Sequence, residues 1–247
     1  MEFNSIWFSW ILTTNKIAVI TGASEGIGRA ISIKLASEGY YTILAGRNEE
    51  NLRKTAKLIS QVNGQYLVYK ADITSEQDVM NLFRKVVKLG ELVILVNNAG
   101  VGTFKAVEEI SLKEWQDMLD VNLTGSFLST REAIKLMKKN KKGHIIFINS
   151  MSGKRALSWG SGYSATKYGL KGFADTVRIE LRKSNVKVTS IFPGSVNSSW
   201  WDKLDFNFSR DQMLNEKNVV DAVFSTVSQE GHSVIEEIDL RQVGGDF

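Results

Sequence analysis

Short apolar runs alternate with longer amphipathic runs along the whole chain of 247 residues. Several of the short runs are apolar almost throughout, which is typical of parallel strands covered on both faces. The alternation predicts right-handed crossovers and an α/β fold, a doubly wound and mostly parallel seven-stranded sheet with helices on both faces. We expect strands at 16–21, 40–45, 66–71, 92–97, 144–149, 186–192 and 233–238. We expect helices at 26–38, 49–62, 75–89, 112–139, 161–183 and 217–229.

The chain is predicted to form one domain, over residues 15–247. It contains a single proline and no glycine-, serine- or proline-rich linker. Residues 1–14 are predicted to be an extension, because their run of Trp, Phe, Ile and Leu is too short to span a bilayer. The extension is interpreted either as an edge-packed segment or as a contact for a membrane surface or a partner. It lacks a basic leader and a cleavage site, so we expect a cytoplasmic protein.

Composition excludes several classes of function. The chain has no cysteine and two histidines, which excludes disulfides and thiolate zinc sites and argues against a transition metal. The net charge of +4 is mild, and a nucleic-acid partner is not expected. The lysines at 135–142 are interpreted as the solvated end of a helix, where cations are favoured.

A glycine-rich turn follows the first predicted strand, with Gly22, Gly26 and Gly28 directly before a helix. Glycines let the backbone approach a ligand closely, and the helix N-terminus offers free N–H groups, so the turn suits a pyrophosphate. A second interpretation remains open, because residues 22–26 also fit the G-x-S-x-G nucleophile elbow of serine hydrolases. Ser24 would then be the nucleophile, and His144 or His232 its base.

The second predicted strand ends at Gly46 and Arg47, 18 residues after Gly28. An acidic residue at this distance would hold the adenine ribose hydroxyls of NAD(H). Arg47 instead offers a planar fork that matches a phosphate, which favours NADP(H) over NAD(H). The negative charge of Glu25 in the glycine turn would repel such a phosphate. The alternative interpretation of Arg47 is an ordinary solvated surface arginine.

Tyr163 and Lys167 are four residues apart within a predicted helix, so their side chains share one face. The same spacing at Tyr66 and Lys70 lies in a predicted strand, where it separates the two side chains by roughly 13 Å. An ammonium about 4 Å from a phenol could lower its pKa by roughly 3 units from about 10, into the range of general acid/base catalysis. A pair of ordinary surface side chains is the alternative.

Further motifs occur in a fixed order along the chain. They are T-G-x-x-x-G-x-G at 21–28, Asp72-Ile73, N-N-A-G at 97–100, Asn122, Ser150 thirteen residues before Tyr163, and P-G-x-V at 193–196. In this ordered set the chain resembles the compact, single-domain short-chain dehydrogenases/reductases, from about residue 15 to the C-terminus. That family has a Rossmann-like fold. The C-terminal residues 239–247 depart from the D-G-G ending of many relatives.

The resemblance implies a role for each matching residue. Tyr163 would be the general acid/base, and Lys167 would lower its pKa and bind the nicotinamide ribose. Ser150 would hydrogen-bond the substrate oxygen, with Ser152 as a competing assignment, and Asn122 would anchor a water that extends the proton path. Asn97 and Asn98 would support the cofactor from below, and Asn97 would tie neighbouring strands together. The residues implied to bind the cofactor are Gly22, Ser24, Gly26, Ile27, Gly28, Arg47, Asp72, Ile73, Asn98, Ala99, Gly100, Tyr163, Lys167, Pro193, Gly194 and Val196.

The stretch 195–216 is rich in aromatic and apolar residues and is expected to form a substrate lid. Its side chains either line an apolar pocket or pack the lid onto the body, and Trp159 is expected at the same pocket. The lid residues in question are Trp200, Trp201, Leu204, Phe206, Phe208, Met213 and Leu214.

The expected function is an NADP(H)-dependent oxidoreductase that interconverts a carbonyl and a secondary alcohol on a small, partly apolar molecule. Similarity in appearance favours a 3-oxoacyl thioester reductase or a broad carbonyl reductase. A protein that senses NADPH without turnover is the alternative from another class. Because the two long helices often pair between subunits in this family, a homodimer or homotetramer is expected.

Overall fold

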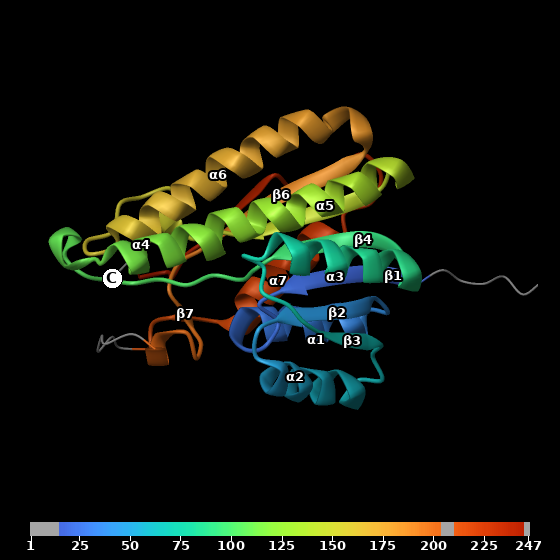
Figure 1. The fold of residues 1–247 in the computed structure, drawn as a ribbon, viewed down its shortest axis with the longest axis horizontal. Coiled ribbons are helices and arrows are strands. Elements are labelled where there is room, and N and C mark those ends of the chain that lie inside the picture. The colour runs from blue at the N-terminus through green and yellow to red at the C-terminus, as the bar shows by residue number, and fades with distance from the viewer. Residues whose placement is uncertain (1–14, 204–209, 245–247) are drawn as a thin grey trace, which may run out of the picture.

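The computed structural model describes residues 15–203 and 210–244 (Figure 1). In this part of the chain a seven-stranded parallel sheet has the strand order β3-β2-β1-β4-β5-β6-β9. Its strands are β1 (Asn15–Thr21), β2 (Tyr41–Gly46), β3 (Tyr66–Lys70), β4 (Gly90–Asn97), β5 (Gly143–Ile148), β6 (Val186–Pro193) and β9 (Glu237–Leu240). The short strands β7 (Val196–Asn197) and β8 (Leu214–Asn215) pair with each other beyond the sheet.

Helices cover both faces of the sheet, which confirms the predicted doubly wound α/β architecture (Figure 1). Helices α3, α5 and α6 pack against one face, whereas α1, α2 and α7 pack against the other. The helices are α1 (Gly26–Ser37), α2 (Glu49–Gln61), α3 (Glu76–Leu89), α4 (Leu112–Leu119), α5 (Gly125–Asn140), α6 (Ser161–Leu181) and α7 (Glu216–Val227).

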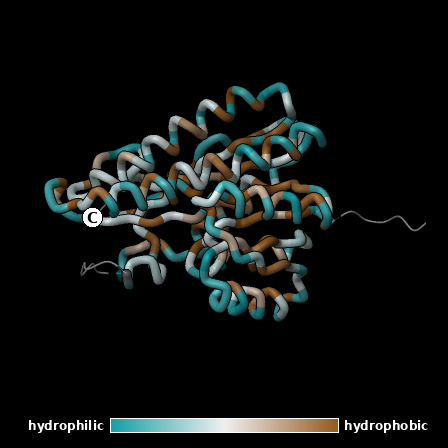
Figure 2. Tube along the Cα trace, viewed as in Figure 1, coloured by the Kyte–Doolittle hydropathy of each residue, from teal (hydrophilic) through white to brown (hydrophobic). Residues whose placement is uncertain are grey.

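The core consists of the strands and of the inward stripes of the helices. Figure 2 shows apolar residues gathered along the strands and hydrophilic residues on the outer sides of the helices. Ala18, Val19 and Ile20 of β1 are fully buried, because helices cover this central strand from both sides. A parallel sheet covered in this way requires the near-continuous apolar runs that the sequence contains.

The strand order reverses between β1 and β4. From β1 the chain builds outward to β2 and β3, then returns to place β4 on the other side of β1. At such a switch point the connections leave in opposite directions, and a crevice opens beyond the carboxyl ends of the strands. The carboxyl ends of β1 and β4 therefore mark the place for a ligand site.

The predicted helix at 112–139 is interrupted. Helix α4 passes into a π-helical segment at Asp120–Thr124 before α5 begins. Within this segment the buried Asn122 side chain bonds to both backbone groups of Val101, a contact that is 21 residues distant along the chain. The spacing of apolar residues does not predict this π-helical turn, because the turn is associated with the tertiary hydrogen bonds between Asn122 and Val101.

The last predicted strand, at 233–238, is shifted along the chain: β9 begins at Glu237 and ends at Leu240. Its register is determined by pairing with β6, where Ser190 lies opposite Glu237 and Pro193 opposite Leu240. The apolar run 234–235 precedes this ladder, so local hydrophobicity marked the wrong boundary. The predicted extension at 1–14 lies outside the described residues. None of the described helices combines the length and apolar character that crossing a bilayer demands.

We predict that His144 limits stability in acid. The Thr189 hydroxyl donates to the Ile235 carbonyl at 2.6 Å, so it accepts from His144 Nε2 at 2.8 Å. Burial, aided by the Lys187 charge, lowers the pKa of His144 to about 3. Below pH 6.5, His144 binds a proton in the unfolded chain but stays neutral in the folded chain. The free energy of unfolding therefore falls as the pH drops.

In His144→Gln, the loss of unfolding free energy between about pH 6.5 and pH 4.5 should be smaller, by up to about 1.4 kcal/mol per pH unit. Urea titrations at several pH values measure this difference. His232→Gln is the control, because His232 is exposed. Parallel pH profiles for wild type and His144→Gln would show the prediction to be wrong.

Candidate active site

A crevice of about 630 Å³ lies beyond the carboxyl ends of the strands. Residues that follow each of the strands β1 to β6 contribute to its walls. All of the residues that the sequence analysis assigned to the cofactor line it: Gly22, Ser24, Gly26, Ile27, Gly28, Arg47, Asp72, Ile73, Asn98, Ala99, Gly100, Tyr163, Lys167, Pro193, Gly194 and Val196. Ser150 lines the crevice as well, whereas Asn122 does not.

The glycine turn is packed too tightly for side chains. A Cβ atom on Gly28 would lie 2.3 Å from the Gly22 carbonyl oxygen and 2.4 Å from Asn98 Nδ2. Gly22 itself has a φ of 68°, a conformation that favours glycine. The turn after β1 therefore requires glycine at both positions in order to pack against the end of β4.

Helix α1 begins in this turn without a side-chain cap, since its N-cap residue Glu25 makes no capping hydrogen bond. Helices α5 and α6 also begin without one, whereas side chains cap α2, α3, α4 and α7, namely Asn48, Ser75, Ser111 and Asn215. The first N–H groups of α1 thus face the crevice with the positive end of the helix dipole. This donor set fits the pyrophosphate of a dinucleotide.

Asn98 and Asn97 have different structural roles. Asn98 Nδ2 donates to the carbonyl oxygens of Thr21 and Gly22 at 3.0 and 3.2 Å, which ties the ends of β1 and β4 together. Asn97 Nδ2 instead donates to Thr130 Oγ1 of α5 at 2.9 Å. The expectation that Asn97 links neighbouring strands is wrong, because its side chain points into the helix layer and Asn98 makes that link.

Arg47 is exposed at the end of β2 and lines the crevice. Asp72, at the end of the neighbouring strand β3, accepts hydrogen bonds from the backbone N–H and the hydroxyl of Thr74. The Asp72 carboxylate is therefore held in its own turn. A cationic fork at this edge of the crevice is matched to a phosphate on the adenosine half of a dinucleotide.

Ser150, Tyr163 and Lys167 meet at the far end of the crevice. Ser150 follows β5, and its hydroxyl is hydrogen-bonded to the Tyr163 phenol. Lys167 lies one turn further along α6, with its Nζ atom 5.6 Å from the centre of the Tyr163 ring. In contrast, Tyr66 and Lys70 are the two ends of strand β3. The same spacing thus brings one pair together and separates the other.

The electrostatics of this group differ from the sequence-based expectation. Burial raises the pKa of Tyr163 to about 12, although the hydrogen bond with Ser150 acts in the opposite direction. Burial also lowers the pKa of Lys167 to about 8, and its ammonium donates to the Ile148 carbonyl at 3.0 Å. The expected lowering of the Tyr163 pKa is not found in this geometry, because burial has the largest effect on the phenol and only the Ser150 hydrogen bond opposes it. Tyr163 is therefore protonated at neutral pH.

Asn122 lies behind this group. Its Oδ1 atom accepts from the Val101 N–H at 2.8 Å, and its Nδ2 atom donates to the Val101 carbonyl and to Thr166 Oγ1. The side chain thereby joins the π-helical segment to the loop after β4 and to α6. Water anchoring by Asn122 stays a prediction.

Ser152 is nearly buried, and its N–H donates to Ser150 Oγ at 3.1 Å. The hydrogen bond to the phenol belongs to Ser150, which favours Ser150 over Ser152. Sequence reasoning missed Asn149, whose side chain accepts from the Ser150 N–H and donates to the Lys167 carbonyl at 3.2 Å. Its position directly before Ser150, at the end of an apolar strand, was the available signal.

An aromatic cluster covers the phenol. Ring centres of Phe104, Tyr163 and Trp200 lie 5.5 to 5.9 Å apart, and Trp201 packs edge-on against Trp200 at 5.2 Å. The predicted lid thus contributes Trp200 and Trp201 to the crevice, while Leu214 packs against the core. Leu204, Phe206 and Phe208 lie outside the described residues.

The expectation for Trp159 is wrong, since this residue is 59% exposed and is not part of the crevice wall. Its backbone has a φ of 59° and pairs with Lys105, which turns the side chain outward. Sequence reasoning missed Phe104, because nothing in its local pattern connects it with α6.

The hydrolase interpretation of Ser24 is wrong. Ser24 follows the carboxyl end of β1, whereas His144 lies near the amino end of β5 and is bonded to Thr189. His232 is exposed on the loop that leads into β9. Both histidines therefore belong to the opposite edge of the sheet. Within the described residues, no group of three or more His, Asp or Glu side chains is arranged to hold a metal ion.

Comparisons with known proteins agree with this architecture. Residues 16–206 match the family model described as short chain dehydrogenase. The chain is 33% identical over 239 residues to the sepiapterin reductase of Chlorobaculum tepidum, covering 94% of this chain and 98% of that protein. The chain belongs to the short-chain dehydrogenase/reductase family and is an NAD(P)-dependent oxidoreductase.

Solved structures are also similar. A metagenomic short-chain oxidoreductase in complex with NADP has a TM-score of 0.82 and 31% identity, covering 93% of this chain and 98% of that one. An alcohol dehydrogenase of the archaeon Thermococcus sibiricus, complexed with 5-hydroxy-NADP, has a TM-score of 0.85 and 29% identity, covering 92% and 97%.

We predict that Lys167 lowers the stability of the fold at neutral pH. Its pKa of about 8 means that the unfolded chain binds a proton more tightly, so the penalty is complete below about pH 8 and disappears above pH 10.5. Lys167→Met should raise the free energy of unfolding at pH 7 by up to about 3 kcal/mol. Urea titrations at pH 7 and near pH 10 should show the gain shrinking as the pH rises.

Lys217→Met is the control, because Lys217 is exposed on α7 and forms an ion pair with Asp221 one turn further along the helix. Its effect should stay within about 0.5 kcal/mol at either pH. A gain in Lys167→Met that did not change with pH would refute the role of the buried charge.

Proposed function

We propose that this protein is an NADP(H)-dependent reductase that converts a carbonyl group to a secondary alcohol. The observation that carries the proposal is the hydrogen-bonded pair of Ser150 and Tyr163 beside Lys167, at the end of a crevice that fits a dinucleotide. Catalytic roles are assigned to Ser150, Tyr163, Lys167 and Asn122. The cofactor supplies the hydride, and the protein supplies the proton and the orientation.

Tyr163 donates the proton. The raised pKa keeps the phenol protonated at neutral pH, so it can hydrogen-bond a carbonyl oxygen and transfer its proton as negative charge develops there. Ser150 holds the same oxygen from the side of β5 and stabilises the developing charge. The protonated phenol is the form that carbonyl reduction requires.

Lys167 supports this proton transfer. Its ammonium stands behind the Tyr163 ring, fixed by the Ile148 carbonyl, where its charge stabilises a phenolate once the proton has left. The same ammonium is assigned to the ribose hydroxyls of the nicotinamide half. Asn122 is assigned to the proton path beyond Lys167, and a Cβ atom on Gly100 would lie within 3.9 Å of both side chains.

The other residues of the crevice wall are assigned to parts of the cofactor. The uncapped start of α1 would hold the pyrophosphate, and the Asp72–Ile73 step would contact the adenine. Arg47 binds the 2′-phosphate and gives the preference for NADP(H). Two similar solved structures contain NADP or a derivative of it, which supports this choice.

The substrate is a small carbonyl compound with an apolar portion. Phe104 and Trp200 pack against the Tyr163 ring, and Trp201 packs on Trp200, so an apolar or aromatic group beside the carbonyl would be desolvated there. A broad carbonyl reductase and a 3-oxoacyl thioester reductase both satisfy this condition. The similarity to a sepiapterin reductase supports the first of these, because a planar ring system suits an aromatic wall.

We also propose a homodimer or homotetramer. The outer face of α6 exposes the large apolar side chains of Tyr168 and Ile179, at 47% and 64%. Phe127 of α5 is 41% exposed and contacts Phe173 of α6. Helices α5 and α6 run side by side along one face of the molecule, so together they offer a continuous surface to a second subunit (Figure 1).

We predict that Tyr163→Phe lowers kcat for carbonyl reduction about 100-fold or more, because it removes the proton donor and leaves the ring in place. Oxidation of NADPH in the presence of a panel of aldehydes, ketones and 3-oxoacyl thioesters measures the effect. Tyr66→Phe is a matched control with the same Tyr-x-x-x-Lys spacing in a strand, and it should keep turnover within about twofold.

Ser150→Ala should lose at least about tenfold in kcat, and Ser152→Ala much less. Unchanged turnover in Tyr163→Phe would overturn the catalytic assignment. A wild-type protein that binds NADPH but reduces no member of the panel would be a sensor rather than a reductase.

We predict that Arg47→Ala raises the KM for NADPH about tenfold or more and leaves the KM for NADH nearly unchanged, because a charge-assisted hydrogen bond to the 2′-phosphate is lost. Steady-state kinetics with both cofactors measure this ratio. Arg53→Ala is the control, since Arg53 is exposed on α2 and pairs with Glu49. Equal changes in both KM values would contradict the role of Arg47 in cofactor choice.

A further inference from the structure

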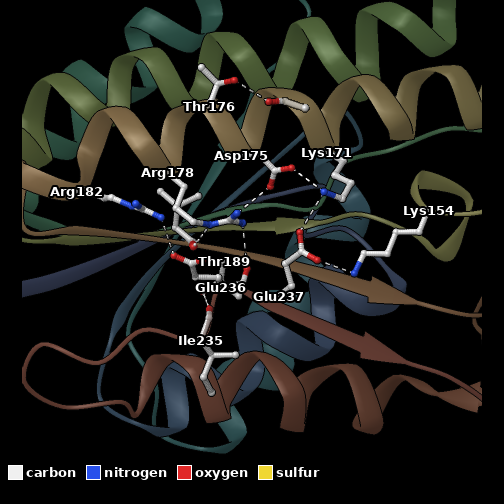
Figure 3. A network of polar contacts seen from close by, with 12 residues as sticks. Lys154, Lys171, Asp175, Thr176, Arg178, Arg182, Thr189, Ile235, Glu236 and Glu237 are labelled. Carbon is white, nitrogen blue, oxygen red and sulfur yellow. Dashed lines mark hydrogen bonds and ion pairs between the residues drawn. The ribbon is translucent and has the colours of Figure 1, made fainter.

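The carboxylate of Glu237 lies between two lysines from different parts of the chain (Figure 3). Its Oε2 atom lies 2.6 Å from Lys154 Nζ, and its Oε1 atom lies 3.3 Å from Lys171 Nζ. The three side chains are 20 to 30% exposed, so solvent screens their charges only partly. One carboxylate thus forms two ion pairs at once.

Each lysine belongs to a segment that carries part of the catalytic group. Lys154 directly follows the short helix η3 (Met151–Gly153), whose N-cap residue is Ser150. Lys171 lies one turn beyond Lys167 on α6, on the same face of the helix. Glu237 therefore connects the loop that holds Ser150 with the helix that holds Tyr163 and Lys167.

The edge strand β9 gives this carboxylate a fixed position. Side chains alternate along a strand, so Glu237 and Asp239 share the face below α6, while Ile238 and Leu240 pack into the apolar cluster on the other face. Pairing with β6 sets the register. Lys154 is held further by an ion pair with Asp239 and by a position 4.0 Å from the centre of the Phe192 ring.

A second connection between the same two segments lies deeper. Asn149 Nδ2 donates to the Lys167 carbonyl, and Gly153 packs so tightly that a Cβ atom would lie 2.9 Å from that oxygen. This contact fixes one point of the junction. The ion pairs of Glu237 add a further contact between the two segments, nearer the surface.

We propose that Glu237 is a positioning residue, which holds the Ser150 loop and helix α6 in the relative orientation that the reaction requires. The inference rests on the reductase function proposed above. Glu237 is not part of the crevice wall. It acts through Lys154 and Lys171, and a small change of this orientation is costly because proton transfer depends steeply on geometry.

The test is Glu237→Gln, which keeps the size of the side chain and removes its charge. With saturating NADPH we expect kcat to fall about fivefold to tenfold, with less than a twofold change in the KM of the carbonyl substrate. High salt should lower kcat of the wild type toward that of the variant, because the ion pairs are partly exposed. Glu237→Asp, with a shorter reach, should give an intermediate kcat.

Two matched variants lie on the same segment. Glu236→Gln removes the neighbouring carboxylate, which is 3.7 Å from Arg182 at the far end of α6, and should leave kcat unchanged. Asp239→Asn removes one partner of Lys154 and leaves the Glu237 bridge intact, so its loss of kcat should be smaller. Equal kcat values for Glu237→Gln and Glu236→Gln, or an effect confined to KM, would overturn the proposal.

A readout without turnover separates this inference from the proposed function. The ring carbon signals of ¹³C-labelled tyrosine can be assigned to Tyr163 with the Tyr163→Phe variant. We expect this signal to shift in Glu237→Gln and to stay in place in Glu236→Gln. If the shift occurs in a protein that reduces no carbonyl, the proposed function fails and the positioning role stands. An unmoved Tyr163 signal in Glu237→Gln refutes the positioning role.

Discussion

The packing of the turn after β1 against the end of β4 is the constraint on which the rest of the site depends. Gly28, Gly22 and Asn98 approach so closely that one added methyl group would overlap a carbonyl oxygen or an amide. This contact aims the uncapped start of α1 into the crevice, and two hydrogen bonds from Asn98 Nδ2 maintain it. The N–H groups are thereby oriented before any anion arrives, so binding does not have to order them.

Burial has opposite consequences for the two titratable groups at the other end of the crevice. It raises the pKa of the Tyr163 phenol, which favours the neutral form, and it lowers the pKa of Lys167, which disfavours the charged ammonium. The site therefore combines a ready proton donor with a cation whose charge is poorly solvated, and such a cation gains most from a nearby negative charge. If Lys167 has the role proposed above, stability and activity make opposite demands on it, which is a common property of functional sites.

The orientation of these groups is supported from outside the crevice. The Ser150 loop and α6 meet at the buried contact between Asn149, Gly153 and Lys167. They meet again at the edge strand, where the acidic face of β9 lies below the basic side chains of α6 (Figure 3). The polar face of β9 thus contacts Lys154 and Lys171, and its apolar face packs on the core.

The sequence by itself determined the fold class, the glycine turn and the pairing of Tyr163 with Lys167, because each depends on periodicity or on a fixed short spacing. Only the tertiary structure decided the π-helical turn at Asn122, the register of β9, the outward direction of Trp159 and the bond of Asn97 to α5. It also decided the pKa of Tyr163. Each of these features depends on burial or on contacts with segments that are distant in the sequence. Local sequence patterns do not predict which distant segments will be in contact.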